Sequence, residues 1–269
     1  KGVVAPHKPR SCCAIWASGE HGGCAGGRWD GVDEHCMIIR TAFAFIFCAI
    51  GYNASAQNAA VIPTGAMRNT LFNGQLSALI SMDSIAVPGT HSIGPLEHLQ
   101  GELILLDGHC YVSTVTRDSA MQVVERTDVG APFFVQQHVV KWASVALPDS
   151  IIDLRSLDDF LTASYAERKT AFAFKLVGTV EKVDVHLVNL PRGTVVNGPD
   201  DAHAHNKQYS LVDQEVEALG FFSTQHKAVF THHDSNIHVH AITSDRSWMG
   251  HVERMRFDPR ATQLWIGLP

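Results

Sequence analysis

The apolar positions of this chain fall into short runs separated by turn residues, a pattern that predicts strands more often than helices. The clearest pair of runs covers residues 102–106 and 109–113, with Asp107-Gly108 between them. Both positions of a type I′ turn need positive φ, so this pair predicts a β-hairpin. Glu102 shares a strand face with Ile104 and Leu106, where a carboxylate is either a rim residue or a ligand.

One stretch has the spacing of a helix. Ser156 as N-cap, the acidic pair Asp158-Asp159 and apolar residues at i, i+3 and i+4 predict an amphipathic helix to about residue 169. Strands are predicted over residues 171–176, 180–190, 220–231 and 236–243, with a break at Gly178 and a surface connection over 191–201. These elements predict an α+β fold of mostly antiparallel or mixed β-sheet with few helices.

The composition is that of a globular protein with a sizeable core: 269 residues, 45% hydrophobic, 18% charged and a formal net charge of -6. Mild acidity and the lack of a Lys/Arg block argue against a nucleic acid or an anionic membrane as the main partner. We therefore expect a small-molecule substrate, and leave open whether the chain forms a homodimer.

Residues 37–56 have the three parts of a secretory signal peptide. Arg40 lies in a short charged start, an apolar run over 41–50 is too short to span a bilayer, and Ala54-Ser55-Ala56 is an A-x-A cleavage signal. Cleavage leaves Gln57 first and predicts export, to the periplasm or outside the cell, with no membrane attachment afterwards. A buried N-terminal helix is the alternative. Since a signal peptide begins its chain, we interpret residues 1–36 as untranslated upstream sequence or a disordered stretch.

This interpretation leaves Cys110 as the only cysteine of the mature chain, so no internal disulfide is expected there. A second arrangement, a zinc knuckle before residue 37, has a spacing that fits no common zinc finger. Its members are His21, Cys24, His35 and Cys36.

Three histidines near the end of the chain have the spacing of a metal site. His238 and His240 are two residues apart in a predicted strand and project from the same face. A polar, Gly-terminated connection follows, so His251 opens a returning strand and faces them. Three imidazoles suit zinc (Zn²⁺) and other divalent first-row metals, and leave one position for water or substrate. The alternative is chance, because the chain has 16 histidines.

Three groups of residues together resemble, in order and spacing, the α-acetolactate decarboxylases. They are Gly101-Glu102-Leu103-Ile104 with Leu106-Asp107-Gly108 and Tyr111, the run 172–176 with Gly178-Thr179, and His238-Val239-His240 with Asp245 and Gly250-His251. The resemblance covers about residue 65 to residue 269. It implies a two-part α+β domain over 57–269, with β-rich halves of about 57–165 and 166–269. It also implies a zinc ion held by His238, His240 and His251, with Glu102 at the metal.

The resemblance implies a carbon–carbon lyase that decarboxylates 2-acetolactate, or a related 2-hydroxy-3-oxo acid, to acetoin. Loss of carbon dioxide leaves an enediolate, whose charge a metal stabilises as a Lewis acid, and a proton must then be delivered. Glu102 is the first candidate catalytic residue.

Two features depart from the family pattern. His186 stands where members carry an arginine, and the catalytic glutamate of the family comes from a tail beyond Leu268-Pro269. Histidine cannot replace arginine as a bidentate clamp for a carboxylate. His186 is therefore the candidate general acid, and Lys175 is the other candidate for the role of the arginine. Three other histidines, His226, His232 and His233, are further candidates for the general acid. Alternatively, they orient the metal ligands or lie at the surface.

Two other functions remain as alternatives. One is a relative that binds a metal or small ligand but has altered catalysis, as the missing arginine suggests. The other is a cupin-like metalloenzyme, because His-x-His followed by Asp245 and a later histidine is similar to cupin metal sites. Cupins usually carry glutamate there and a more distant last histidine.

Overall fold

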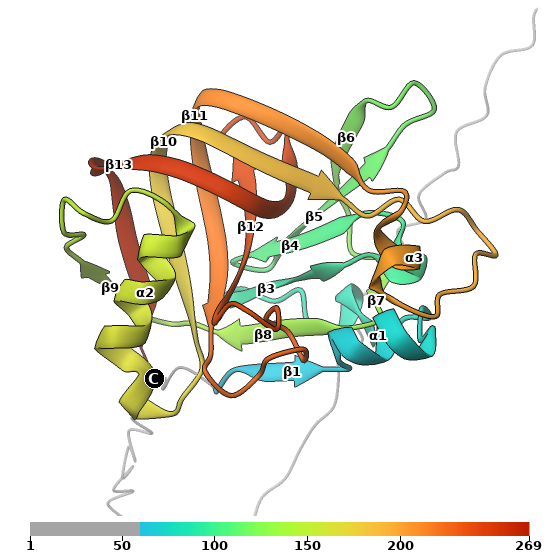
Figure 1. Ribbon diagram of the computed structural model, residues 1–269, viewed down its shortest axis with the longest axis horizontal. Helices are drawn as coiled ribbons and strands as arrows, with labels where there is room; N and C mark the ends of the chain where they lie inside the picture. Colours follow the sequence, from blue (N-terminus) through green and yellow to red (C-terminus); the bar gives the residue numbers. More distant parts are fainter. Residues whose placement is uncertain (1–59, 269) are drawn as a thin grey trace, which may run out of the picture. The chain divides into compact units, whose positions relative to one another are not determined.

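The computed structural model describes residues 60–268, so the predicted signal peptide and the cysteines and histidines before it lie outside the described residues. Two antiparallel sheets form most of this part (Figure 1). The six-stranded sheet contains, in spatial order, β1 (Ile62–Thr64), β8 (Phe134–His138), β3 (Thr90–Pro95), β4 (Glu102–Leu106), β5 (His109–Val115) and β6 (Met121–Glu125). The five-stranded sheet contains β10 (Phe172–Leu187), β11 (Lys207–Phe222), β12 (Ile237–Thr243), β13 (Met249–Gly267) and β9 (Trp142–Val145).

The remaining elements are short. A two-stranded sheet joins β2 (Ile80–Ser81) to β7 (Gly130–Ala131). The α-helices are α1 (Met67–Asn73), α2 (Leu154–Tyr165) and α3 (Pro199–His203), and the 3-10 turns are η1 (Met82–Ser84), η2 (Glu97–Leu99) and η3 (Ala166–Arg168). Mostly antiparallel β-structure with few helices confirms the predicted fold class. None of the helices within residues 60–268 is long and apolar enough to cross a membrane.

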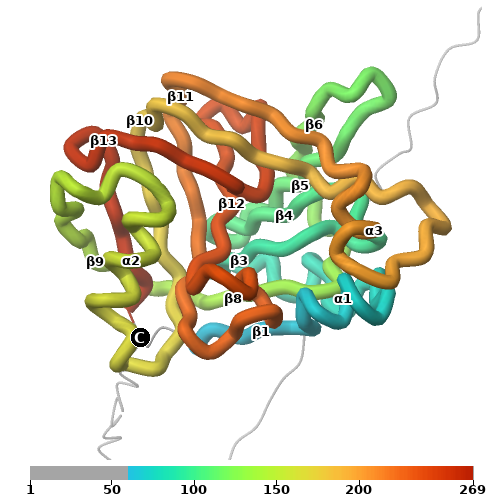
Figure 2. The backbone as a smooth tube through the Cα atoms, in the orientation of Figure 1, coloured from blue at the N-terminus to red at the C-terminus, as the bar shows by residue number. Residues whose placement is uncertain are grey.

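The predicted hairpin is confirmed as β4 and β5, which pair directly across a two-residue turn. Asp107 and Gly108 have φ values of 53° and 85°, as a type I′ turn requires. The hairpin belongs to the six-stranded sheet, whose apolar side chains share a core with those of the five-stranded sheet. Ile104 of the first sheet and Leu219 and Ile242 of the second belong to this core. The path of the chain in Figure 2 shows β3, β4 and β8 lying beside β11 and β12. This packing brings the start of β4 close to β12.

The helix of the sequence pattern is α2, but its predicted N-cap is wrong. Asp153 is the N-cap, and its carboxylate accepts a hydrogen bond of 2.8 Å from the Ser156 backbone N–H. Ser156 is the third residue of the helix and its hydroxyl accepts from the Asp153 N–H at 3.1 Å, which completes a capping box. Either residue type can cap a helix, so the pattern alone does not distinguish them.

The predicted break at Gly178 is also wrong, because β10 runs through it. Gly178 pairs with Val216 on one side and Thr262 on the other. Its φ is 152°, and an added Cβ would lie 2.2 Å from the Ala261 carbonyl oxygen. The glycine therefore allows β13 to approach closely at an irregularity of the ladder, instead of ending the strand.

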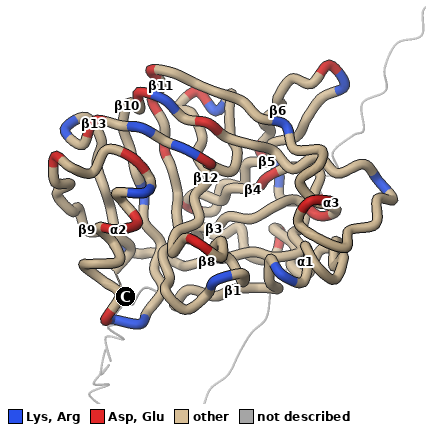
Figure 3. Tube along the Cα trace, viewed as in Figure 1, with Lys and Arg blue, Asp and Glu red and all other residues tan. Residues whose placement is uncertain are grey.

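Two further boundaries differ from the predicted ones. The strand predicted over 220–231 is β11, which begins at Lys207 and ends at Phe222, and the predicted connection over 191–201 leads into α3. Lysine and aspartate or glutamate alternate with apolar residues along β10 and β11, and Figure 3 shows these charges spread over the long strands. Because of these charged residues, the first part of β11 lacks the apolar pattern of a predicted strand. Its pairing with β10 and β12 stabilises it as a strand.

Gly220 offers a test of the close packing within this sheet. It pairs with Phe174, and an added Cβ would lie 2.2 Å from Cζ of that ring. Since the ring is fully buried and cannot move freely, Gly220→Ala should lower the free energy of unfolding by about 1–3 kcal/mol. Val212→Ala, at a position of the same strand that is 59% exposed, should change it by less than about 0.5 kcal/mol. Urea unfolding of both variants measures this, and equal effects would contradict the packing argument.

Candidate metal centre

The adjacent strands β12 and β13 bring the three predicted histidines together. His238 and His240 lie on one face of β12, and His251 pairs directly with His240 across the ladder. The intervening Val239 and Ala241 pack into the core of the five-stranded sheet, which holds the strand in place. One nitrogen of each imidazole lies within 4.8 Å of the corresponding nitrogens of the other two, and all three residues are buried. This spacing is compatible with a single metal ion.

His240 has a defined tautomer. Its Nδ1–H donates to the Leu103 carbonyl oxygen at 2.9 Å, so Nε2 carries the free lone pair. That Nε2 is buried and has no hydrogen-bond partner. A buried acceptor without a partner is costly in a folded protein, and a metal ion would satisfy it. The residues present therefore fit the metal that the resemblance implies.

The other two imidazoles face each other, with His238 Nε2 and His251 Nδ1 3.0 Å apart. Burial lowers the pKa of His240 to about 3 and lowers the pKa of His238 and His251 well below the usual value. Neighbouring imidazoles lower each of them further. All three are therefore neutral, which is the form that binds a metal.

Glu102 reaches this centre from the other sheet. It is 2% exposed, and its Oε2 lies 3.6 Å from His240 Nε2, while its Oε1 accepts a bond of 3.3 Å from the Val188 N–H. Burial raises the pKa of this carboxyl well above its usual value, against a smaller lowering by the Val188 bond. The structure thus places Glu102 beside the lone pair of His240 and away from the outer surface.

His186 also lies at the centre and has a carboxylate partner. It pairs with His251 across the β10–β13 ladder, and the two ring centroids are 4.6 Å apart. Its Nδ1 donates to Glu253 Oε1 at 2.9 Å. This bond is the main cause of the lowered pKa of Glu253. His186 and Glu253 therefore add a hydrogen-bonded polar pair beside the three histidines.

The sequence interpretation missed Glu253. Val185 pairs with Val252 and Asp184 with Arg254, so Glu253 is an extra residue in β13 at a shift of register. Such bulges re-aim a side chain, and they depend on the pairing of two distant segments. The one local signal is its position two residues after the third histidine, on the same strand face.

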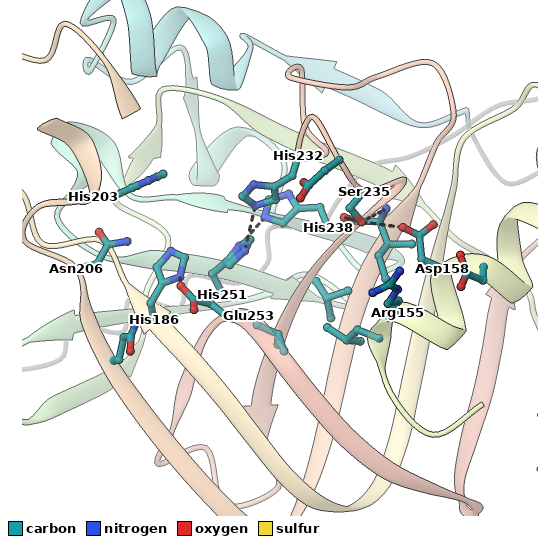
Figure 4. Close-up of a pocket in the computed structure, with 17 residues that line it drawn as sticks. Arg155, Asp158, His186, His203, Asn206, His232, Ser235, His238, His251 and Glu253 are labelled. Atoms are coloured by element: carbon teal, nitrogen blue, oxygen red, sulfur yellow. Dashed lines mark hydrogen bonds and ion pairs between the residues drawn. The ribbon is translucent and has the colours of Figure 1, made fainter. Parts of the chain in front are cut away.

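A cavity of about 830 Å³ opens onto the centre. Figure 4 shows His238, His251 and His232 at its middle, His186 and His203 on one side, and Arg155 and Asp158 of α2 on the other. Arg155 is the one lysine or arginine among the described residues that line it. The cavity is therefore rich in imidazoles and large enough for a small organic acid.

The structure does not bring Lys175 to this cavity. Its Nζ lies 3.4 Å from Glu217 Oε1 and 4.6 Å from the centroid of the Trp142 ring. Lys175 and His186 are at opposite ends of β10, and Lys175 is not among the residues that line the cavity.

The three further candidates for the general acid, His226, His232 and His233, differ in their positions. His232 lies against the centre, with its Nε2 3.3 Å from His251 Nε2. His226 instead shares a hydrogen bond of 2.7 Å with Ser223 Oγ, and His233 is exposed. His203 of α3, which the sequence interpretation did not single out, lines the cavity beside His186 at 6.4 Å between ring centroids.

Comparisons with known proteins agree on one family. The family model for alpha-acetolactate decarboxylase matches residues 64–265. The alpha-acetolactate decarboxylase of Brevibacillus brevis is 25% identical over 193 residues, which are 71% of this chain and 64% of that relative. The match thus spans less than two thirds of the length of the relative.

Solved structures show the same fold. The alpha-acetolactate decarboxylase from Bacillus subtilis strain 168 superposes with a TM-score of 0.64 at 18% identity, over 78% of this chain and 86% of that one. A Staphylococcus aureus protein of unknown function, described as similar to alpha-acetolactate decarboxylase, gives a TM-score of 0.64 at 17% identity, with the same coverage of 78% and 86%.

Proposed function

The chain belongs to the alpha-acetolactate decarboxylase family, and we propose that it is a metal-dependent lyase that converts 2-acetolactate, or a related 2-hydroxy-3-oxo acid, to acetoin or the corresponding hydroxyketone. The observation that carries the proposal is the buried trio of His238, His240 and His251 beside Glu102, with an unpartnered Nε2 on His240. Catalytic metal sites commonly have three protein ligands and an open position, and two of the three histidines here, His238 and His251, line the cavity.

The three imidazoles would hold the ion, for which we propose zinc. When bound, the metal supplies Lewis-acid stabilisation of the negative charge that develops as carbon dioxide leaves. Burial of the trio contributes to this function, since a site that excludes water strengthens every electrostatic interaction within it.

Glu102 and His186 act on the substrate itself. Glu102 lies beside His240 Nε2, where its carboxylate acts as a general base that takes the proton of the substrate hydroxyl and returns it to the product. His186 occupies the position of the family arginine and delivers the proton that replaces the lost carboxyl group. Because its Nδ1–H is held by Glu253, His186 can deliver a proton only from Nε2, which carries one in the imidazolium form.

Purified protein tests the proposal in two measurements. Elemental analysis should give about one metal ion per chain, as one ligand trio implies. Incubation with racemic 2-acetolactate should then produce acetoin. Absence of bound metal would reject the proposal. Bound metal without acetoin would instead support the alternative function, a metal- or ligand-binding relative with altered catalysis. The presence of His186 where family members carry an arginine favours that alternative.

Replacing His186 tests its proposed role directly. His186→Gln should reduce kcat by about 10²–10⁴, the usual contribution of a general acid, while metal content stays the same. His226→Gln is the matched control, since His226 bonds Ser223 and does not line the cavity, and it should leave kcat unchanged. Steady-state acetoin formation measures both. Unchanged turnover in His186→Gln would exclude the role of proton donor.

Export is a separate proposal that rests on residues 37–56. The charged start, apolar run and A-x-A signal support cleavage after Ala56 and a mature protein in the periplasm or outside the cell. N-terminal sequencing of the native protein should give Gln57 as the first residue. A peptide from before Met37 would contradict it.

A further inference from the structure

The loop between β11 and β12 places one more imidazole against the metal centre. His232 Nε2 lies 3.3 Å from His251 Nε2, with 5.2 Å and 63° between the two rings. The residue before it, Thr231, is fully buried, and its carbonyl accepts a bond of 2.8 Å from the Ala228 N–H. The loop therefore holds His232 on a fixed segment, and the dashed lines in Figure 4 join His251 to both His232 and His238.

The two nitrogens of His251 have different partners. Nδ1 faces His238 Nε2 at 3.0 Å, so it belongs to the inner side of the trio, and Nε2 points outward to His232. An imidazole that binds a metal through one nitrogen carries a proton on the other, and that proton needs an acceptor. Within residues 60–268 the structure gives His251 Nε2 no other hydrogen-bond partner.

His232 is suited to be this acceptor. A neutral imidazole accepts through its unprotonated nitrogen, and a charged one cannot accept at all. His232 lies close enough to accept this proton, with its Nε2 3.3 Å from His251 Nε2. Its ring also meets that of His238 edge-on at 6.3 Å, which limits its rotation. The distance and the packing of His232 therefore agree with its role as the acceptor.

We propose that His232 is a positioning residue of the metal centre, which accepts the Nε2–H of His251 and thereby directs the Nδ1 lone pair of that ring toward His238 and His240. This inference rests on the metal site of the proposed function, and it does not depend on which substrate is decarboxylated. Residues that hold a ligand in this way typically change metal affinity by about 10–100-fold. His232 should therefore strengthen metal binding without touching the ion.

The test compares variants at position 232 for metal affinity. The Kd of Zn²⁺ is measured at fixed pH by competition with a chromophoric chelator. His232→Phe keeps a ring but has no acceptor, and should bind Zn²⁺ about 10–100-fold more weakly than the parent. His232→Gln offers an amide oxygen and should recover most of the affinity. His226→Phe is the matched control from the same loop and should bind as the parent does.

A second readout separates positioning from direct ligation. The Co²⁺-substituted parent and His232→Phe should show the same visible absorption bands, because the three inner imidazoles are unchanged. Equal Zn²⁺ affinity in the parent and His232→Phe would overturn the inference, and so would a change in Co²⁺ coordination, which would make His232 a ligand. His232→Ala replaces the Phe variant if that one does not fold.

The outcomes also separate this inference from the proposed function. A parent that binds Zn²⁺ and depends on His232 but forms no acetoin contradicts decarboxylation alone. A parent that forms acetoin with no dependence on His232 contradicts the positioning role alone. A parent that binds no metal overturns both.

Discussion

Replacing His240 with alanine should abolish stoichiometric metal binding and destabilise the protein. His240 is fully buried and its Nε2 has no hydrogen-bond partner. The two imidazoles that remain after its removal cannot restore the geometry of the site. The loss of affinity should exceed the about 10–100-fold expected for an outer residue. The substitution also removes the hydrogen bond from His240 Nδ1–H to the Leu103 carbonyl, whose net contribution is about 0.5–1.5 kcal/mol.

Elemental analysis and thermal unfolding with and without a chelator measure both effects. Metal that binds the native state alone stabilises it by about 2.7 kcal/mol at a free concentration 100 times its Kd. A chelator should therefore lower the Tm of the parent and leave that of His240→Ala unchanged. His238→Ala should behave in the same way, and His226→Ala should retain the response of the parent. Full metal content in either trio variant would show that these histidines do not hold the ion.

The second large effect is expected at Glu102. Glu102→Gln should lower kcat by about 10²–10⁴, because the amide keeps the shape of the carboxylate but loses its capacity as a base. The Gln carbonyl oxygen can still accept the Val188 N–H, so folding and metal content should be preserved. Glu102→Ala removes that acceptor as well and should also reduce the free energy of unfolding, by about 1–3 kcal/mol.

Acetoin formation at equal metal content distinguishes these effects. A fall in kcat in Glu102→Gln with an unchanged Tm supports a role in catalysis, whereas a fall in Tm alone indicates that the buried carboxylate is structural. Turnover equal to that of the parent would remove Glu102 from the proposed site.

The elements predicted correctly are those defined by neighbours in sequence. The Asp107-Gly108 turn, the strand with His238 and His240 and the return at His251 depend on local spacing and on the φ preferences of a few residues. The errors occurred where pairing with distant strands overrides local preference, as in the passage of β10 through Gly178.

The sequence by itself determined that three imidazoles project together and that a buried hairpin begins with Glu102, since strand periodicity decides both. Only the tertiary structure decided that Glu102 meets His240, because this contact depends on two sheets packing across a shared core. It also decided that His186 and Glu253 face the cavity and Lys175 does not. Such contacts join residues far apart along the chain, and their geometry comes from side-chain packing and a β-bulge, which no local pattern specifies.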